Sequence, residues 1–450
     1  MIRTIEKQDV EYKSSWRDEY LKWICGYANA YGGRLYVGIN DKKEIVGVDD
    51  AKKLSEDIPN KIQNILGIVA DVNILTDSAG SKDYLEIIVE SYPYPVNYKG
   101  EYHYRSGSTK QELKGSALNK FILERTGKHW DGIPIPKVSV DDLSLIALQR
   151  FRREAARSKR VDEDVLDDST EHLLQDLHLV DEETGLLKRA AILLFHPDPE
   201  RFVTGAYVKI GFFRGDDDDL AFHDEVRGSL MEQIEKAMDL LTSKYITYAI
   251  SYEGVSRRET PTFPKYALRD SLLNSIEHNA YSSGVPVQIS VYPDHIVFWN
   301  PGHLPDAIPM ETLLQKHPSI PYNPDVANTL FRSGDIEIWG RGYRKIIKAV
   351  LENKQLPPNI KDVGGLMITY YRDIRTQLLE EKADEKLIRV MEYVATNGSV
   401  TNSEIRKMLN VSKVTATRLL WKADTWLEQE GKAGRGTKHM FTCKKVEIGS

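Results

Sequence analysis

The sequence predicts a multidomain α/β protein that ends in a small, mainly helical domain. Three observations support this prediction. The chain has 450 residues, which is too long for one hydrophobic core, so roughly three or four domains are expected. Up to about residue 372, segments in which apolar residues have helical spacing alternate with short strand-like segments. After residue 385 the apolar residues have helical spacing until a final hairpin.

The composition limits the class of protein. No apolar run reaches the roughly 18 residues that a membrane span needs, and no signal peptide is evident at the N-terminus, so we expect a cytoplasmic protein without a membrane partner. Cys25 and Cys443 lie in unrelated segments and predict neither a disulfide framework nor a metal site. The net charge of −6 is not that of a uniformly basic protein, so nucleic-acid binding requires local basic patches.

Residues 1–125 have the pattern of an α/β domain. "YLKWICGYANAYGG" has helical spacing and stops at a glycine pair, and "RLYVGIN" and "IVGV" predict the two strands of a hairpin. "YLEIIVESYPYPV" and "YHYRSGST" predict two further strands. Prolines and glycines in "GKHWDGIPIPKVSV" predict a linker over 126–140.

The rest of the chain divides where its composition changes. The predicted segments are an intermediate α/β segment at 141–255, a motif-rich α/β segment at 256–372, a charged helical connector at 373–384 and a small helical domain at 385–445. "DDDD" in the intermediate segment predicts a solvated acidic loop, with cation binding as the lesser alternative.

The C-terminal pattern is that of a winged helix-turn-helix. Thr401 or Asn402 can cap a helix in which Ile405, Met408 and Leu409 face inward. "NVS" is the turn, "KVTATRLLWKAD" is the second helix with Val414, Leu419 and Leu420 toward the core, and "EGKAGRGTKHMFTC" forms the wing. The segment carries 12 Lys/Arg against 6 Asp/Glu, which favours nucleic acid over the alternative of a protein-interaction module.

A nucleotide pocket without a P-loop is predicted in 256–372. Asp270 and Asn274 are four residues apart, so they project from one face of a helix, where a carboxylate can hold an attacking water and a carboxamide can hold Mg²⁺. "NPGHLP" follows a strand, and "WGRGYRKI" precedes a helix. Both loops can wrap purine and phosphates, with backbone N–H groups toward the anion.

These motifs resemble the gyrase–chaperone–histidine-kinase (GHKL) ATPases over about 262–350, in the divergent branch found beside Schlafen AlbA domains in bacterial regulators. The resemblance implies a GHKL-like α/β sandwich, with 141–255 as a candidate first half. It also implies ATP and Mg²⁺ as cofactors and Asn274 as the metal ligand. The implied nucleotide contacts are Asn300 and Gly302 near the adenine, His278 at the end of the helix, and Gly340, Arg341 and Gly342 at the phosphates.

Three positions depart from the family pattern. Asp270 stands where the family has Glu, so the candidate catalytic carboxylate is one methylene shorter. "HNAY" replaces the family's "HRDY" after the helix, and Asn300 occupies the adenine-contacting Asp position. ATP binding is therefore a firmer expectation than ATP hydrolysis.

The N-terminal motifs "VEYK", "ANAYGGRLYVGIND", "EIVGV" and "RSGS" resemble the Schlafen AlbA domain over most of 1–125. In animal Schlafens the related fold carries an RNA endonuclease, and the matching metal ligands here are Glu6, Glu11 and Asp41, for Mg²⁺ or Mn²⁺. The alternative is structural: Glu11 pairs with Lys13 or Arg105, and Asp41 serves a turn.

The sequence therefore predicts an ATP-binding, nucleic-acid-binding bacterial regulator that forms a dimer or higher oligomer. The main alternative is a metal-dependent Schlafen-like endoribonuclease in phage or stress defence, and a weaker one is an interaction adaptor with both sites degenerate. Candidate phosphate contacts are Lys13, Arg34, Lys42, Lys43, Lys99, Arg105 and Lys110 in the first domain, and Lys413, Thr415, Arg418, Lys422 and Arg435 in the last. Tyr98, Tyr102 and Tyr104 are candidates for stacking on bases.

Overall fold

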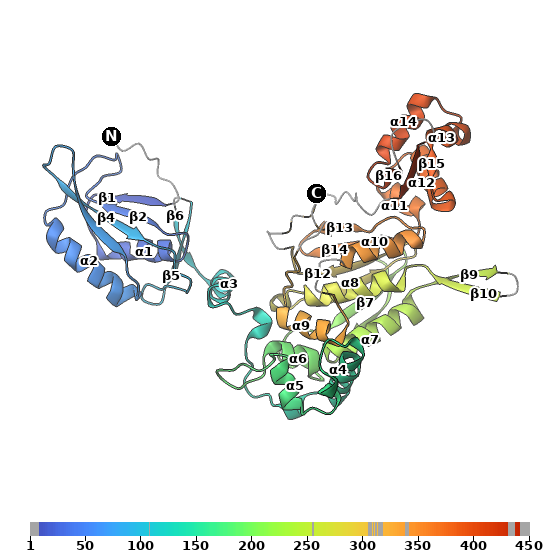
Figure 1. Cartoon of the computed structure of the whole chain (residues 1–450), viewed down its shortest axis with the longest axis horizontal. Helices are drawn as coiled ribbons and strands as arrows, with labels where there is room; N and C mark the ends of the chain where they lie inside the picture. The colour runs from blue at the N-terminus through green and yellow to red at the C-terminus, as the bar shows by residue number, and fades with distance from the viewer. Residues whose placement is uncertain are drawn as a thin grey trace. The chain divides into compact units, whose positions relative to one another are not determined.

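The computed structural model divides the chain into two compact units, residues 1–129 and 130–450, and each unit is described by itself. The structure describes residues 9–441 apart from 108, 254–255, 305–307, 309, 311–312, 314–317, 338–341 and 431–436. Figure 1 shows the secondary-structure elements along the chain. No helix among the described residues is long and apolar enough to cross a membrane.

The first unit is built on a four-stranded sheet in the order β1-β2-β4-β3, in which β1 and β2 are parallel and the other pairs antiparallel. Its strands are β1 (Val10–Lys13), β2 (Gly33–Val37), β3 (Asp71–Thr76) and β4 (Asp83–Val89). Helices α1 (Leu21–Ala28) and α2 (Ala51–Leu66) bury Leu21, Ile24, Ile58 and Ile62 against Leu35, Leu85 and Ile87 of the sheet. The hairpin β5 (Tyr102–Ser106) and β6 (Thr109–Leu113) and helix α3 (Gly115–Thr126) complete the unit.

The predicted hairpin between "RLYVGIN" and "IVGV" does not form. Strand β2 already has β1 on one side and β4 on the other, so residues 45–48 form no regular strand. They keep an isolated bridge between Ile39 and Ile45, and the Val46 and Gly47 backbone N–H groups donate to the Gly38 carbonyl. The Asn40 side-chain oxygen accepts the backbone N–H groups of Lys42 and Glu44 and holds the turn. The strand predicted from "YHYRSGST" is confirmed as β5.

The second unit is built on a six-stranded sheet in the order β13-β14-β12-β11-β7-β8. Strands β7 and β11 are parallel and the remaining neighbours are antiparallel. The strands are β7 (Val208–Phe213), β8 (Leu220–Val226), β11 (Val287–Val291), β12 (His295–Asn300), β13 (Asn359–Asp362) and β14 (Leu366–Tyr371). The intermediate segment therefore contributes two strands to the same sheet as the motif-rich segment.

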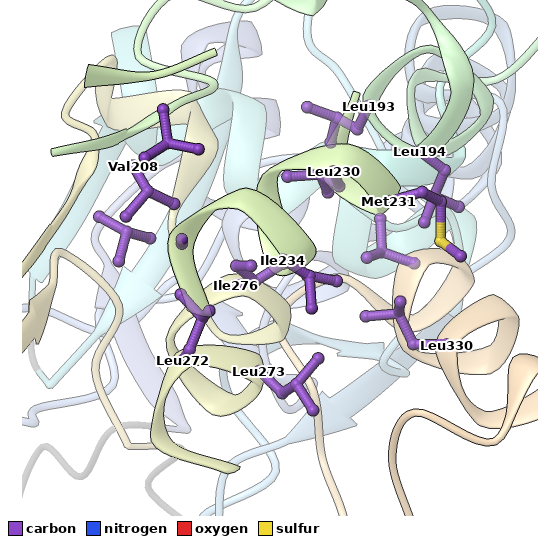
Figure 2. Close-up of a cluster of buried hydrophobic side chains, with 14 of the residues drawn as sticks. Leu193, Leu194, Val208, Leu230, Met231, Ile234, Leu272, Leu273, Ile276 and Leu330 are labelled. Carbon is purple, nitrogen blue, oxygen red and sulfur yellow. The ribbon is translucent and has the colours of Figure 1, made fainter. Parts of the chain in front are cut away.

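The helices between residues 145 and 352 share one hydrophobic core with the sheet. Figure 2 shows the part of the core in which Ile234 of α7 lies beside Leu272 and Ile276 of α8, with Leu330 of α9 nearby. The helices are α4 (Leu145–Ser158), α5 (Thr170–Asp176), α6 (Arg189–Phe195), α7 (Leu230–Leu240), α8 (Lys265–Glu277), α9 (Pro324–Ser333) and α10 (Gly342–Glu352).

Two features on the edge of this unit bear on the predictions. The Asp216–Asp219 run is exposed, as the solvated-loop prediction expected, although Tyr292 donates a hydrogen bond to Asp217. Strands β9 (Tyr248–Glu253) and β10 (Ser256–Pro261) form a separate two-stranded ribbon.

The segment predicted as a linker over 126–140 is largely part of the second unit. The backbone N–H of Ile135 donates to the Leu187 carbonyl, and that of Arg189 donates to the Ile133 carbonyl. Composition predicted a linker because the segment is rich in proline and glycine, but its apolar residues Trp130, Ile135 and Val138 pack into the core of the second unit.

The C-terminal region packs around helix α12 (Glu385–Asn397). Its other elements are β15 (Val400–Thr401), α13 (Asn402–Leu409), α14 (Lys413–Lys422), β16 (Leu427–Glu430) and β17 (Lys438–Phe441), and α11 (Ile374–Glu380) precedes them. Thr401 and Glu404 form a capping box at the start of α13, and Ile405, Leu419 and Leu420 are buried as predicted. Val414 corrects the prediction, because it is 78% exposed and turns away from the core.

Candidate functional site

Helix α8 positions the candidate nucleotide-binding residues. It begins after Pro264 and buries Leu272 and Ile276, which fixes the rotation of the helix and leaves Asp270 and Asn274 on its other side. The two side chains meet as their spacing predicted, with the Asn274 Nδ2 atom 3.4 Å from the Asp270 Oδ2 atom. The Glu277 Oε1 atom, three residues further along, lies 3.0 Å from the His278 Nε2 atom.

The loop after β12 closes against the end of this helix. The Asn300 side-chain oxygen accepts a hydrogen bond from the Gly302 backbone N–H at 2.9 Å, and Asn300 is only 2% exposed. A Cβ atom at Gly302 would lie 1.9 Å from the His278 carbonyl oxygen, so only glycine allows this close approach. Asn300 is therefore a residue that shapes the loop, and it does not line the cavity described below.

The N-terminus of α10 faces the same two side chains. A Cβ atom at Gly342 would lie 3.0 Å from the Asp270 Oδ2 atom and 3.9 Å from the Asn274 Nδ2 atom. The first N–H groups of a helix lack intrahelical acceptors and attract anions. Gly340 and Arg341, the other residues predicted at the phosphates, lie outside the described residues.

A cavity of about 200 Å³ lies between these elements. The predicted residues that line it are Asp270, Asn274, His278, Gly302 and Gly342. The remaining charged residues of the described lining were not predicted from the sequence, and these are Arg160, Arg269, Glu277, Asp335, Glu337 and Lys345. Of these residues, only Glu277 could have been predicted from local spacing, because it follows Asn274 by three residues and so lies on the same face of the helix.

The electrostatics of the cavity bear on its chemistry. Burial, followed by the nearby Glu277 carboxylate, raises the pKa of Asp270 to about 6, while Arg269 and Lys345 act in the opposite direction. Above pH 6 the Asp270 carboxylate is therefore mostly ionised, as a proton acceptor must be. Burial also raises the pKa of the neighbouring Tyr343 phenol, so that group stays neutral and can only share its proton in a hydrogen bond.

These residues fit a magnesium–nucleotide complex. The amide oxygen of Asn274 and a carboxylate oxygen are hard ligands of the type that Mg²⁺ binds. Because position 342 is glycine, the N-terminus of α10 lies close to both side chains, and backbone N–H groups at a helix N-terminus can bind an anion.

The carboxylates predicted as a metal site in the first unit are held differently. The Glu11 carboxylate forms ion pairs with Lys13 at 2.7 Å and with Arg105 at 2.8 Å, as the structural alternative expected. Asp41 lies in an exposed turn after β2. Glu6 lies outside the described residues.

The same ion pairs change the predicted nucleic-acid contacts. Arg105 is 1% exposed and lies 5.4 Å from the Tyr27 ring centroid, so its guanidinium group is not accessible to a phosphate. Arg34 is exposed but pairs with Glu86 at 3.1 Å, and Lys42 is exposed.

A basic and aromatic surface surrounds Trp23 on α1. The Lys13 and Lys110 ammonium groups lie 5.1 and 4.9 Å from the Trp23 ring centroid. Lys22 and Lys99 lie 5.5 and 5.3 Å from the Tyr98 ring centroid. Lys13, Lys99, Lys110 and Tyr98 are among the residues that the sequence predicts as nucleic-acid contacts. Lys22 and Trp23 are not, because "KW" fits the helical spacing and carries no further signal.

Helix α14 carries the predicted contacts of the C-terminal region. Lys413 and Arg418 are exposed, and Thr415 lies in the first turn, which Ser412 caps. Lys422 forms an ion pair with Asp384 at 2.7 Å, which occupies its ammonium group. Arg435 lies outside the described residues.

Asp168, His172 and Asp176 bring three potential metal-binding atoms within 4.8 Å of one another. His172 and Asp176 are exposed and lie on the short helix α5. Exposed clusters of this kind are common without a bound ion, and we assign no function to this one.

Comparison with known proteins identifies two segments of the chain. Residues 6–114 match the family model "Schlafen, AlbA_2", and residues 284–369 match the family model "Putative ATP-dependent DNA helicase recG C-terminal". Both resemblances predicted from the sequence are thereby confirmed: the chain combines an AlbA_2 domain with an ATPase-like domain. None of the curated proteins matches this chain.

Two solved structures are similar to the chain. The crystal structure of the DIP2311 protein from Corynebacterium diphtheriae is 18% identical, with a TM-score of 0.48, over 98% of this chain and 94% of that chain. The solution structure of the N-terminal domain of a RecG-related protein from Nitrosomonas europaea, named there as a putative ATP-dependent DNA helicase, is 24% identical. Its TM-score is 0.17, over 24% of this chain and 84% of that chain.

Proposed function

We propose that this chain, which joins an AlbA_2 domain to an ATPase-like domain, is a nucleic-acid-binding regulator that binds Mg·ATP in the cavity between α8 and α10. Nucleotide occupancy biases the arrangement or self-association of its parts, and thereby its binding to nucleic acid. The ATPase-like family match and the geometry of α8 support the nucleotide, and the AlbA_2 match supports the nucleic acid.

One observation carries the nucleotide part of this proposal. Asp270, Asn274 and the first residue of α10 come together although Gly342 is 68 residues away from Asn274 in the chain, and glycine permits their close approach. All three line the same cavity. The arrangement places a candidate metal ligand, a carboxylate and the N-terminus of a helix in one cavity wall.

Each residue then has a defined role. Asn274 offers its amide oxygen to the metal, the N–H groups of α10 bind phosphate, and the loop at Gly302 borders the base. When bound, Mg²⁺ would offset negative charge on the phosphates. In hydrolysis, Asp270 would orient a water and accept its proton while the water oxygen bonds to the γ-phosphorus and ADP leaves.

The surface around Trp23 is the proposed nucleic-acid contact of the first unit. Lys99 and Lys110 supply cations for phosphates, and the partly exposed Trp23 ring supplies a face for a base. Lys13 and Lys22 are already paired with Glu11 and Glu101, so they contribute charge to this surface at a lower net value. We further infer that residues 385–445 act as a winged helix-turn-helix, in which the exposed face of α14 enters a groove.

Calorimetric titration with Mg·ATP tests the nucleotide site. Asn274→Ala removes the metal ligand, and Gly342→Ala fills the space beside Asp270, so each variant is expected to weaken binding at least tenfold. Asn60→Ala, on the exposed side of α2 in the first unit, is the matched control and keeps wild-type affinity. Wild-type affinity in both cavity variants would refute the proposed site.

The structure favours binding over cleavage of nucleic acid. Glu11 is neutralised by two cations, so its oxygens are already engaged where a metal would need them. We expect tRNA, single-stranded RNA and duplex DNA to remain intact with Mg²⁺ or Mn²⁺, while their mobility shifts in a salt-sensitive way. Cleavage that disappears in the exposed-site variant Asp41→Ala would instead establish the endonuclease.

A further inference from the structure

The residues that connect the two units are bound tightly to the second one. Residue 130 is the first of that unit, and its indole ring stacks on Tyr281, with ring centroids 6.2 Å apart and planes inclined by 21°. The Arg189 guanidinium group covers the same indole at 4.5 Å, and it also donates a hydrogen bond to the Trp130 carbonyl. The connection to the first unit is therefore anchored at this point.

The next residue, Asp131, caps helix α9. Its Oδ2 atom accepts the backbone N–H groups of Asp325 at 2.8 Å and Val326 at 3.0 Å, and Asp131 is fully buried. The residue before the helix, Asn323, makes no capping bond with its side chain. A residue 194 positions away thus supplies the acceptor that a helix usually takes from its own N-cap.

Helix α9 is connected to the nucleotide cavity at both ends. The Asn323 amide donates to the carbonyls of Glu277 at 3.0 Å and Asn279 at 2.8 Å, at the end of α8. Ser319 and Ile320 before α9, and residues 334–337 after it, line the cavity. A displacement of α9 therefore changes the walls of the cavity.

The cap carries a cost that packing alone does not explain. The Oδ1 atom of Asp131 is buried and has no hydrogen-bond partner among the described residues. An unsatisfied buried polar atom is uncommon in native structures. The two hydrogen bonds to α9 are therefore the interactions that offset this cost, and they tie the Trp130–Asp131 segment to the helix.

We propose that Asp131 is a positioning residue that couples the nucleotide cavity to the connection between the units. Nucleotide in the cavity fixes α9, and α9 fixes the Trp130–Asp131 segment through the cap. By linkage, if nucleotide shifts the equilibrium between a docked and an undocked Trp130–Asp131 segment by some factor, docking of that segment changes nucleotide affinity by the same factor. This inference rests on the proposed nucleotide site and adds the route by which occupancy reaches the first unit.

The test uses the full chain with Mg·ATP, and two readouts. The first is the affinity for Mg·ATP by calorimetry. The second is the rate at which trypsin cleaves after Lys128, an exposed residue just before the anchored segment, with and without saturating Mg·ATP. In the wild-type protein Mg·ATP is expected to slow this cleavage.

Asp131→Ala removes the cap acceptor and is expected to weaken Mg·ATP binding roughly fivefold. At saturating Mg·ATP it is also expected to abolish the protection of Lys128. Asp131→Asn keeps an acceptor of the same size and restores both readouts. Asp142→Ala, in the exposed capping turn at Ser139–Asp142, is the matched control and leaves both unchanged.

The outcomes separate this inference from the proposed function. Wild-type protein that does not bind Mg·ATP refutes the nucleotide site itself. Wild-type protein that binds Mg·ATP, together with an Asp131→Ala variant that keeps both affinity and protection, refutes the coupling alone. If Asp131→Ala does not fold, the wild-type protein decides: equal cleavage at Lys128 with and without Mg·ATP overturns the inference.

Discussion

The Asp270 carboxylate is confined by its neighbours. Because a Cβ atom at Gly342 would lie 3.0 Å from its Oδ2 atom, a longer glutamate at this position would press on the first turn of α10. The shorter acid found here therefore suits the local packing.

Asp270→Asn is expected to retain Mg·ATP affinity within about twofold and to lose most of the slow hydrolysis, because a carboxamide cannot accept a proton from water. Phosphate release under single-turnover conditions, beside calorimetric titration, measures the two properties separately. Turnover equal to wild type would show that another group, or no group, acts as the base.

The pH dependence of hydrolysis follows from the same residue. The pKa of Asp270 is raised to about 6 by burial and by Glu277, and only the deprotonated form accepts a proton. The rate is therefore expected to rise between pH 5 and pH 7 and to level off above that. A rate that falls over this interval would contradict the assignment of Asp270 as the base.

The Glu11–Arg105 pair is a structural element of the first unit. Arg105 is 1% exposed, so removal of the Glu11 carboxylate leaves a buried charge without compensation. Glu11→Ala is expected to lower the free energy of unfolding by about 3 kcal/mol. Urea unfolding measures this value, and Glu19→Ala, at an exposed site nearby, serves as the control. A loss below about 0.5 kcal/mol would show that water reaches the pair.

At the scale of elements, α14 presents an apolar and basic face. Val414 and Trp421 are 78% and 77% exposed, and Arg418 lies between them on the same side of the helix. Exposed large apolar side chains beside cations suit a groove with phosphate walls and base faces. The same face was only partly predicted, because helical periodicity assigned Val414 to the core.

If α14 enters a DNA groove, Arg418→Ala is expected to weaken duplex binding and to reduce the slope of log K against log[salt] by about 1. Fluorescence anisotropy over a range of salt concentrations measures both. Lys386→Ala, on the exposed side of α12, is the control and keeps the wild-type slope. An unchanged slope in Arg418→Ala would remove α14 from the interface.

Local sequence patterns predicted individual helices and caps better than they predicted which segments pack against one another. The spacing of Asp270 and Asn274 and the cap at Thr401 depend on neighbours within one helix. The spacing was predicted correctly, and Thr401 was one of the two predicted caps. The docking of Asp131 on α9 depends on a contact 194 positions away, which no local period encodes. The missing strand at 45–48 has the same origin, because β1 and β4 compete for the edges of β2.

At the scale of the whole molecule, the boundary between the units falls before Trp130 rather than inside a free linker. A fragment of residues 130–450 is therefore expected to bind Mg·ATP with near wild-type affinity. A fragment that begins at residue 136 lacks Trp130 and Asp131 and is expected to bind more weakly and to unfold at a lower temperature. Calorimetry and thermal unfolding compare the two, and equal behaviour would refute the boundary.

The parallel pairing of β7 with β11 also affects synthesis of the chain. The first unit is complete once residue 129 has left the ribosome, whereas β7 must wait about 80 residues for β11, the strand that pairs with it in parallel. At about 5–20 residues per second this delay is roughly 4–16 s. During that time one edge of β7 is an unpaired, apolar strand. The nascent second unit is thus a candidate client for ribosome-associated chaperones, while the first unit is already folded.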